Sequence, residues 1–249
     1  MKHEAQGGGS RPSASTPRYW AVIPAAGSGA RMASAVPKQY LPLRGKTVLQ
    51  HTLERFLDNP RIHAVVLVLA PDDARWPRIA SQYEGRPLIV VHGGRERCNS
   101  VLNGLLALAE RAAPDDWVLV HDAARPCVRR EDIDILVERL HDHRVGGLLG
   151  IPVADTKKRV DRDGNVIETV DRHDLWRALT PQMFRYEALL RALRAALEQD
   201  NVVTDESSAI EMTGQRPRMV EGNADNIKIT RPQDLALAEW YLAQREEDS

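Results

Sequence analysis

The chain has 249 residues, 43% of them hydrophobic and 28% charged, and its formal net charge at pH 7 is −1. These values are typical of one globular α/β domain, and the balanced charge gives no general reason to bind nucleic acid or an anionic membrane. The two cysteines form no CxxC pair and no apolar run approaches the roughly 18 residues of a membrane span, so we expect a cytoplasmic protein.

Residues 1–17 are rich in Gly, Ser and Pro and contain no apolar segment like that of a secretory signal. They have nothing to bury, so we expect a disordered N-terminal extension. The folded part, a single domain over residues 18–249, is expected to begin with the strand that follows.

That first strand leads into a glycine-rich turn. The apolar run of residues 19–23 ends at Pro24, the small residues 25–29 follow, and cations stand beyond them at Arg31 and Lys38. Small residues let backbone N–H groups approach an anion, and the two cations can neutralise its charge. The stretch predicts a loop that holds a nucleoside triphosphate; the alternative is an ordinary glycine-rich turn with two solvated bases. It is not a P-loop, since no Gly-Lys-Ser/Thr triplet occurs, nor a dinucleotide fingerprint, since Met32 stands at the third glycine.

Helices and strands then alternate along the chain. Residues 63–70 form a continuous apolar run, which is typical of a strand buried on both faces of a parallel sheet. The other elements predicted up to residue 140 are a helix after Thr47, a helix at 72–82, a strand at 88–91, a helix at 97–113, a strand at 117–120 and a helix around 133–140. This order predicts βαβ units, and hence a mostly parallel sheet with helices on both faces.

Three segments of small or polar residues directly follow predicted strands. They are the glycine-rich turn, Gly93-Gly94 and the segment that begins at Asp122. Because ligands bind at the carboxyl ends of the strands in such sheets, we expect the three to converge on one site. His121 and Asp122 are neighbours in an extended chain and point to opposite faces, so His121 is left out of the predicted chemistry.

The pattern changes after residue 150. Residues 156–161 and 165–170 are two short β-like runs joined by Arg162-Asp163-Gly164, and Asp-Gly between such runs predicts a hairpin. A hairpin alone is marginally stable in water, which favours an arm over residues 156–171 that inserts into a second subunit. The alternative is a hairpin that packs on its own domain.

The last part of the chain returns to helices. The predicted elements are helices at 186–199 and 205–213, a strand at 218–221 and a terminal helix that begins at Pro232. Asp205 and Glu206 suit the start of their helix, as a cap and as acids that favour the positive end of the helix dipole.

Five separated segments resemble one family. They are PAAGSGARM…PKQY (24–40), GGRERCNSV (93–101), VLVHDAARP (118–126), TVDRHDLWRALTPQ (169–182) and TDESSAIE…VEGNADNIKITRP (204–232). From residue 19 to about residue 241 the chain resembles the 2-C-methyl-D-erythritol 4-phosphate cytidylyltransferases. The resemblance implies a Rossmann-like nucleotidyltransferase fold, a homodimer with a β-arm, and a Mg²⁺-dependent reaction of CTP with a sugar-alcohol phosphate. That reaction releases pyrophosphate in the non-mevalonate route to isoprenoids.

The resemblance also implies roles for individual residues. Arg31 and Lys38 match cations beside the α-phosphate of CTP. Lys228 and Arg172 match cations that hold the acceptor phosphate, with Arg172 reaching over from the partner's arm. The positions around the nucleoside and triphosphate are Ala25, Ala26, Gly27, Gly94 and Ser100. Those that complete the acceptor site are Asp122, Arg125, Thr156 and Thr180.

Two carboxylates are candidates for the metal. Asp122 is the first candidate for anchoring Mg²⁺ or a substrate hydroxyl, and Asp225 is the second. Magnesium usually takes only one or two protein carboxylates and fills its shell with phosphate oxygens and water. For Asp122 and Arg125 the alternative is a structural ion pair.

The expected chemistry requires no general base. The nucleophile is a phosphate monoester oxygen, largely ionised at neutral pH because its second pKa is about 6. The site has to supply in-line positioning and cancellation of charge where two polyanions meet. The alternatives are a sister cytidylyltransferase acting on ribitol 5-phosphate and a non-catalytic nucleotide-binding module; the presence of both Arg31 and Lys38 favours an enzyme.

Overall fold

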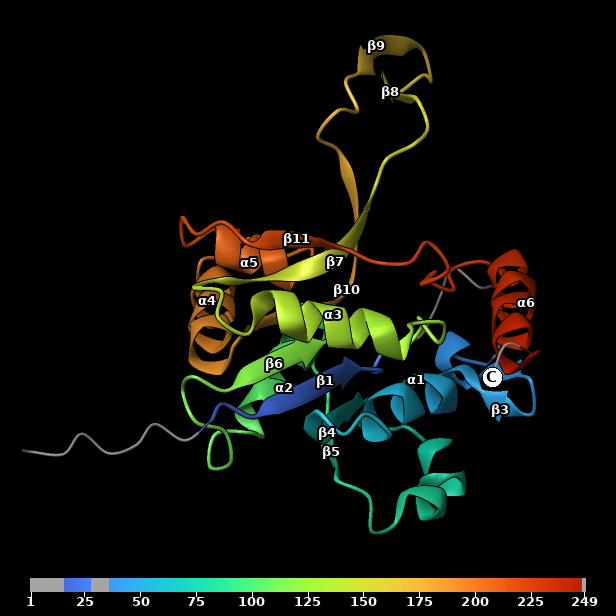
Figure 1. Ribbon diagram of the computed structural model, residues 1–249, viewed down its shortest axis with the longest axis vertical. Coiled ribbons are helices and arrows are strands. Elements are labelled where there is room, and N and C mark those ends of the chain that lie inside the picture. Colours follow the sequence, from blue (N-terminus) through green and yellow to red (C-terminus); the bar gives the residue numbers. More distant parts are fainter. Residues whose placement is uncertain (1–15, 28–35, 248–249) are drawn as a thin grey trace, which may run out of the picture.

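Seven strands form one mixed sheet that runs through the body of the computed structural model (Figure 1). The structure describes residues 16–27 and 36–247, so the disordered extension expected at residues 1–17 lies almost entirely outside the described residues. In order across the sheet the strands are β11 (Arg218–Glu221), β7 (Gly146–Pro152), β10 (Trp176–Arg185), β6 (Trp117–Val120), β1 (Tyr19–Pro24), β4 (Ile62–Leu69) and β5 (Leu88–His92). Neighbouring strands are parallel except at β10, which is antiparallel to β6 and β7. The prediction of a mostly parallel sheet is confirmed.

Alternate side chains of the central strands face two separate hydrophobic cores, because successive residues of a strand point to opposite sides of the sheet. In β1, Ile23 faces one core and Val22 the other. The helices on the first face are α1 (Val48–Leu57) and α3 (Arg130–Leu140), and those on the second are α2 (Arg97–Leu106), α4 (Tyr186–Glu198) and α5 (Glu206–Glu211). Helices therefore cover both faces, as the alternation of elements predicts.

Two predicted helices differ from the observed ones. In place of the one regular helix predicted at 72–82, the chain forms the short 3-10 helices η3 (Trp76–Arg78) and η4 (Ala80–Tyr83). Pro77 lacks a backbone N–H and restricts the residue before it, which disfavours an α-helix. The helix predicted at 97–113 is α2, which ends at Leu106; beyond it the chain continues in tighter turns.

Strands β7 and β10 were not predicted from the sequence pattern. In β7, a Cβ atom at Gly147 would lie 2.0 Å from the carbonyl oxygen of Arg218 in β11, so this position requires glycine. Glycine is uncommon within strands, and the sequence pattern therefore does not indicate one here. In β10, the pairing register shifts between Ala178 and Gln182, around Pro181, which cannot donate to the ladder. The chain leaves the body after β7 and returns as β10, which explains the antiparallel strand.

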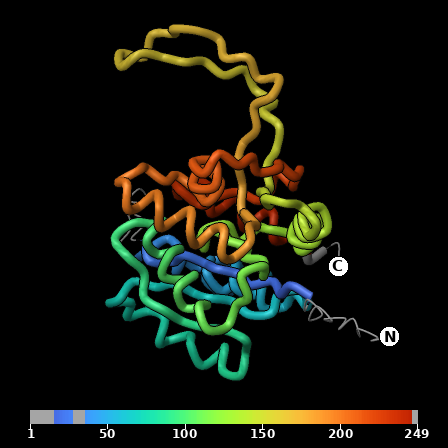
Figure 2. Tube along the Cα trace, turned by 90° about the vertical axis from the view of Figure 1, so that its left-hand side faces the viewer, coloured from blue at the N-terminus to red at the C-terminus, as the bar shows by residue number. Residues whose placement is uncertain are grey.

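The predicted hairpin is present as β8 (Lys157–Val160) and β9 (Val166–Val170), a two-stranded sheet of its own. It projects from the body in both views (Figures 1 and 2), and residues 154–169 are all exposed. The alternative of a hairpin packed on its own domain is therefore wrong. Insertion of this arm into a second subunit stays a prediction.

The terminal helix α6 (Pro232–Glu247) begins at Pro232, as predicted. It packs on a small apolar cluster that includes Leu43, Cys127 and Ile229, and so fixes the segment that precedes it. Among the residues that the structure describes, no helix is long and apolar enough to cross a membrane.

Candidate active site

A pocket with a volume of about 350 Å³ opens at the carboxyl ends of β1, β5 and β6. Its lining residues are Pro24, Ala25, Ala26, Gly27, Lys38, Gln39, Gly94, Arg95, Glu96, Arg97, Ser100, Asp122, Ala123, Ala124, Lys228 and Thr230. The three segments that follow these strands thus meet in one pocket, as expected from the carboxyl-end rule. Lys38 and Lys228, which lie far apart in the chain, complete it.

Close packing shapes the side of the pocket that follows β1 and β5. A Cβ atom at Gly93 would lie 2.6 Å from Ala26 Cβ and 2.7 Å from Ser100 Oγ, so only glycine fits there. Ser100 is buried; its hydroxyl group accepts a hydrogen bond from Gly94 N at 3.2 Å and donates one to Glu96 O at 3.1 Å. This wall is lined by the small residues Ala25, Ala26, Gly27 and Gly94, which suits recognition of a base or a phosphate by main-chain groups.

Gln39 holds the first segment in place. Its side-chain Nε2 donates to the carbonyl oxygens of Ala25 at 2.7 Å and Gly27 at 3.1 Å, and the side chain is buried. Arg31, predicted to act beside the α-phosphate, lies outside the described residues. Sequence reasoning missed Gln39, although it lies in the PKQY segment that carries the resemblance.

On the opposite side of the pocket, the carboxylate of Asp122 lies among three cations. Its Oδ1 accepts from Arg97 Nε at 2.9 Å, and its Oδ2 lies 2.8 Å from Lys228 Nζ and 3.4 Å from Arg125 Nε. Burial alone would raise the pKa of Asp122, but Arg97, Lys228 and Arg125 together hold that pKa well below its usual range. The ion pair between Asp122 and Arg125, given above as the structural alternative, is thus present within a larger cluster at the pocket.

Hydrogen bonds of Thr180 and His121 hold the backbone of this cluster in place. Asp122 N donates to Thr180 Oγ1 at 3.2 Å, and Thr180 Oγ1 lies 2.9 Å from His121 Nδ1. His121 Nε2 lies 3.1 Å from the carbonyl oxygen of Arg125, so Nε2 carries the hydrogen and Nδ1 accepts from Thr180. Burial lowers the pKa of His121 to about 4, so the ring is neutral at pH 7. His121 holds the loop and stays out of the pocket, as expected.

Five of the predicted site residues that the structure describes do not line this pocket: Arg125, Thr156, Arg172, Thr180 and Asp225. Arg125 and Thr180 both contact the lining residue Asp122. Thr156 is exposed on the arm, and Arg172, which directly follows the arm, is also exposed and donates from Nη1 to Ala154 O. Asp225 is buried, and its Oδ2 accepts from Arg129 Nη2 at 2.6 Å and Arg245 Nη2 at 2.8 Å. These ion pairs give Asp225 a structural role; its contact with a metal stays an untested prediction.

The carboxylates present fit a metal that arrives with substrate. Among the described parts of the chain, no group of three or more His, Cys, Asp or Glu residues could hold a metal ion by itself. Asp122 and Glu96 are the acids that line the pocket. One or two carboxylates plus phosphate oxygens form an ordinary magnesium shell.

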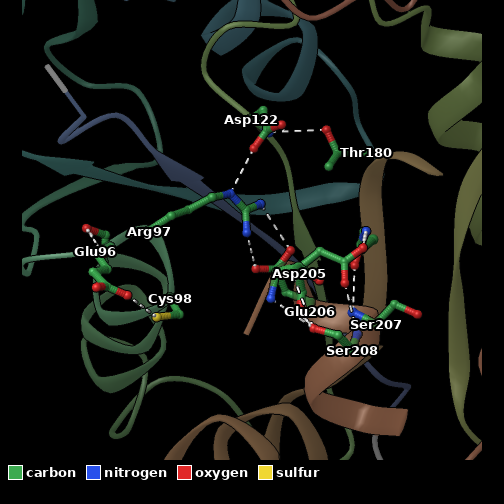
Figure 3. A network of polar contacts seen from close by, with 12 residues as sticks. Glu96, Arg97, Cys98, Asp122, Thr180, Asp205, Glu206, Ser207 and Ser208 are labelled. Atoms are coloured by element: carbon green, nitrogen blue, oxygen red, sulfur yellow. Dashed lines mark hydrogen bonds and ion pairs between the residues drawn. The ribbon is translucent and has the colours of Figure 1, made fainter. Parts of the chain in front are cut away.

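Arg97 and Glu206 were also missed. Arg97 lines the pocket and pairs with both Asp122 and Glu206 (Figure 3). Asp205 does cap α5, accepting from Ser208 N at 2.9 Å, as predicted. The role predicted for Glu206, an acid at the helix dipole, does not account for its complete burial against Arg97.

Comparison with known proteins gives a consistent family. The family model described as IspD, 2-C-methyl-D-erythritol 4-phosphate cytidylyltransferase, matches residues 19–244. A Pseudomonas fluorescens protein of that name is 56% identical over 230 residues, which are 92% of this chain and 96% of the relative. A Hahella chejuensis protein of the same name is 55% identical over 225 residues, 90% of this chain and 93% of the relative.

Solved structures agree with these sequences. A crystal structure of 4-diphosphocytidyl-2C-methyl-D-erythritol synthase has a TM-score of 0.79 and 38% identity, and covers 91% of this chain and 99% of its own. The Francisella tularensis 2-C-methyl-D-erythritol 4-phosphate cytidylyltransferase has a TM-score of 0.77 and 38% identity, with 90% and 99% covered. These scores show that the chain shares the nucleotidyltransferase fold of the solved structures. The chain therefore belongs to the 2-C-methyl-D-erythritol 4-phosphate cytidylyltransferase family.

Proposed function

We propose that this chain joins CTP to 2-C-methyl-D-erythritol 4-phosphate, giving 4-diphosphocytidyl-2-C-methyl-D-erythritol and pyrophosphate on the non-mevalonate route to isoprenoid precursors. Family membership and the names of the relatives support this reaction. The observation that carries it in this molecule is the meeting of Lys38 and Lys228 at one pocket. Two polyanions have to approach each other during the reaction, and two cations from distant segments offset their repulsion.

The bond changes follow from the substrates. A phosphate oxygen of the acceptor attacks the α-phosphorus of CTP, and the bond from that phosphorus to the bridging oxygen of the β-phosphate breaks. Pyrophosphate carries away the electron pair. Because the attacking oxygen is already ionised, the protein has to align the two phosphates and stabilise their charge.

CTP is assigned to the wall of the pocket formed by the residues that follow β1 and β5. The residues proposed to surround the nucleoside and triphosphate are Ala25, Ala26, Gly27, Gly94 and Ser100, all of which line the pocket. Their small side chains leave room for backbone hydrogen bonds to a pyrimidine. Lys38, with Arg31, is proposed to stabilise the charge that develops at the α-phosphate and on the leaving pyrophosphate.

The acceptor is assigned to the side around Asp122. Lys228 is proposed to bind its phosphate, and Asp122, Arg125 and Thr180 to shape the surrounding site. Arg172 and Thr156 of the partner subunit are proposed to complete the site from the partner's arm. The exposure of that arm, which projects from the body (Figure 2), supports this arrangement.

Magnesium is proposed to enter with the triphosphate and to bind Asp122. When bound there, it would offset charge on the phosphates and on the leaving pyrophosphate. Asp122 Oδ2 already has two cations beside it and Oδ1 accepts from Arg97, so a metal at Asp122 would bind the remaining lone pair of Oδ1 or displace one of these cations.

Pyrophosphate release with CTP and Mg²⁺ tests the function directly. We expect turnover with 2-C-methyl-D-erythritol 4-phosphate and little with ribitol 5-phosphate. Turnover with only the ribitol compound would change the acceptor assignment. Binding of CTP without turnover of either acceptor would favour the non-catalytic alternative.

A further inference from the structure

Glu206 is a charged residue whose place in the structure the proposed reaction does not explain. It is the first residue of α5 and is 0% exposed. Asp205 already caps the helix, so Glu206 is not needed there. Burial of a carboxylate is costly unless it is paired, and a buried charge retained near a functional pocket calls for a specific partner.

That partner is Arg97, 109 positions away in the chain. Arg97 Nη1 and Nη2 donate to the two oxygens of Glu206 at 2.7 and 3.1 Å, which makes a bidentate ion pair (Figure 3). Burial alone would lower the pKa of Arg97, but Glu206 and Asp122 raise that pKa above its usual value. The guanidinium is therefore permanently charged, and its planar shape fixes where its third nitrogen points.

The third nitrogen of Arg97 points at Asp122. Arg97 Nε donates to Asp122 Oδ1 at 2.9 Å, and the other oxygen of Asp122 lies 2.8 Å from Lys228 Nζ. Glu206, Arg97, Asp122 and Lys228 thus form a continuous chain of alternating charges. Glu206 offsets the charge of Arg97, which leaves the charge of Asp122 to hold Lys228.

The far end of this chain is anchored to the central sheet. Gln182 in β10 donates from Nε2 to Asp205 Oδ2 at 2.9 Å, and its Oε1 accepts from Ser207 N at 2.7 Å. These two bonds hold the side chain of Asp205 and the backbone of Ser207, the residues on either side of Glu206. The position of the Glu206 carboxylate is therefore fixed by contacts with the sheet. Because Arg97 pairs with this carboxylate, the position of the Arg97 guanidinium is fixed as well.

We propose that Glu206 and Arg97 are a positioning pair for the acceptor side of the site. Glu206 orients the Arg97 guanidinium, which orients Asp122, which places Lys228 beside the pocket before substrates bind. Without Glu206, Arg97 loses two of its three contacts and is free to turn toward the pocket that it already lines. The inference rests on the proposed function, because its readout is the reaction with the acceptor phosphate.

The test is Glu206→Gln, which keeps the shape of the side chain and removes its charge. We expect kcat/KM for the acceptor phosphate to fall about 10- to 100-fold, as when a supporting contact of a functional group is lost or a reacting group is displaced by about 1 Å. The dissociation constant of CTP, measured by calorimetry, should change by less than about threefold. A loss of CTP affinity equal to the loss in kcat/KM would contradict the assignment to the acceptor side.

A double variant separates positioning from simple charge balance. In Arg97→Gln/Glu206→Gln no buried charge is left unpaired, so the melting temperature should recover toward that of the unaltered protein. If the pair positions Asp122 and Lys228, kcat/KM for the acceptor stays low in the double variant. Recovery of both stability and kcat/KM would overturn the proposal.

Asp116→Asn is the matched control at the opposite end of β6. Asp116 is also a buried carboxylate in an ion pair, 3.2 Å from Arg18 Nη2, and lies outside the pocket lining. The Asp116→Asn substitution should lower the melting temperature without changing the KM for the acceptor. An equal KM effect in this control would assign the Glu206 result to general destabilisation and overturn the inference. Absence of turnover in the unaltered chain would instead remove the proposed function, and the inference with it.

Discussion

Lys38 Nζ donates a hydrogen bond to the carbonyl oxygen of Ile229, 3.1 Å away, although the two residues are 191 positions apart in the chain. Ile229 directly follows Lys228, whose ammonium nitrogen lies 2.8 Å from Asp122 Oδ2. The contact therefore joins the segment assigned to CTP to the segment assigned to the acceptor. In the proposed reaction the two lysines offset charge from both substrates at the place where the new bond forms.

Replacing Lys38 tests its part in the transition state. For Lys38→Ala we expect kcat to fall by two to three orders of magnitude, or about 3–4 kcal/mol of barrier, as for loss of one preorganised donor. Affinity for CTP should fall much less, because the cation is needed most where charge develops. Lys46→Ala is the control, since Lys46 is an exposed lysine paired with Glu54 at 2.6 Å. An unchanged kcat in Lys38→Ala would remove Lys38 from the transition state.

Replacing Gln39 tests the clamp on the first loop. Gln39→Glu removes the donor to Ala25 and Gly27 and places a carboxylate against their carbonyl oxygens. Each buried acceptor left without its donor costs about 1–3 kcal/mol, so we expect CTP to bind about tenfold or more weakly. Gln82→Glu is a matched control, because the exposed Gln82 keeps its acceptor for Gln50. Equal CTP affinity in Gln39→Glu and the control would contradict the clamp.

The buried His121 predicts a pH dependence of stability. Burial lowers its pKa from the ordinary 6.5 to about 4, so the unfolded chain binds this proton below about pH 6.5 and the folded chain only below about pH 4. The free energy of unfolding should therefore fall as the pH is lowered through that window, by up to about 3 kcal/mol from this residue. Denaturant unfolding at pH 4 to 8 measures it.

His121→Gln provides the comparison for that pH series. The pKa values of His51 and His143 are also lowered by burial, so they contribute to the slope in both proteins. The difference between the two slopes isolates His121. If the two slopes are the same, the neutral buried state assigned to His121 is incorrect.

Mixing subunits tests the arm. Arg172→Ala and Lys38→Ala are each expected to be nearly inactive; when the two are mixed and allowed to exchange subunits, heterodimers should regain one intact site. Recovery approaching a quarter of full activity is expected for random exchange of equal amounts, since about half of the dimers are heterodimers and each has one intact site of two. Arg159→Ala, on the same arm but paired with Glu168, should be active alone. Failure of the mixture to recover activity would place Arg172 in its own chain's site.

The sequence could predict the site as far as local signals reach. Residues 25–27, 94 and 122 each follow an apolar strand, and parallel strands place their carboxyl ends at one edge, so their convergence follows from topology alone. The arm was also predictable, because an Asp-Gly turn joins its two short runs. Strand β10 was not, since its pairing is interrupted around Pro181 and no local pattern marks an antiparallel return.

By itself, then, the sequence determined the alternating α/β architecture, the strand ends that carry the site, and the motifs of one cytidylyltransferase family. These depend on local periodicity, turn chemistry and short motifs, which are written in consecutive residues. Only the tertiary structure decided that Glu206 is buried against Arg97, that Asp122 meets three cations, and that Lys38 touches the segment of Lys228. The physical reason is distance along the chain. An ion pair between residues 97 and 206 requires no particular residue type at the positions next to either, so no local sequence pattern indicates it.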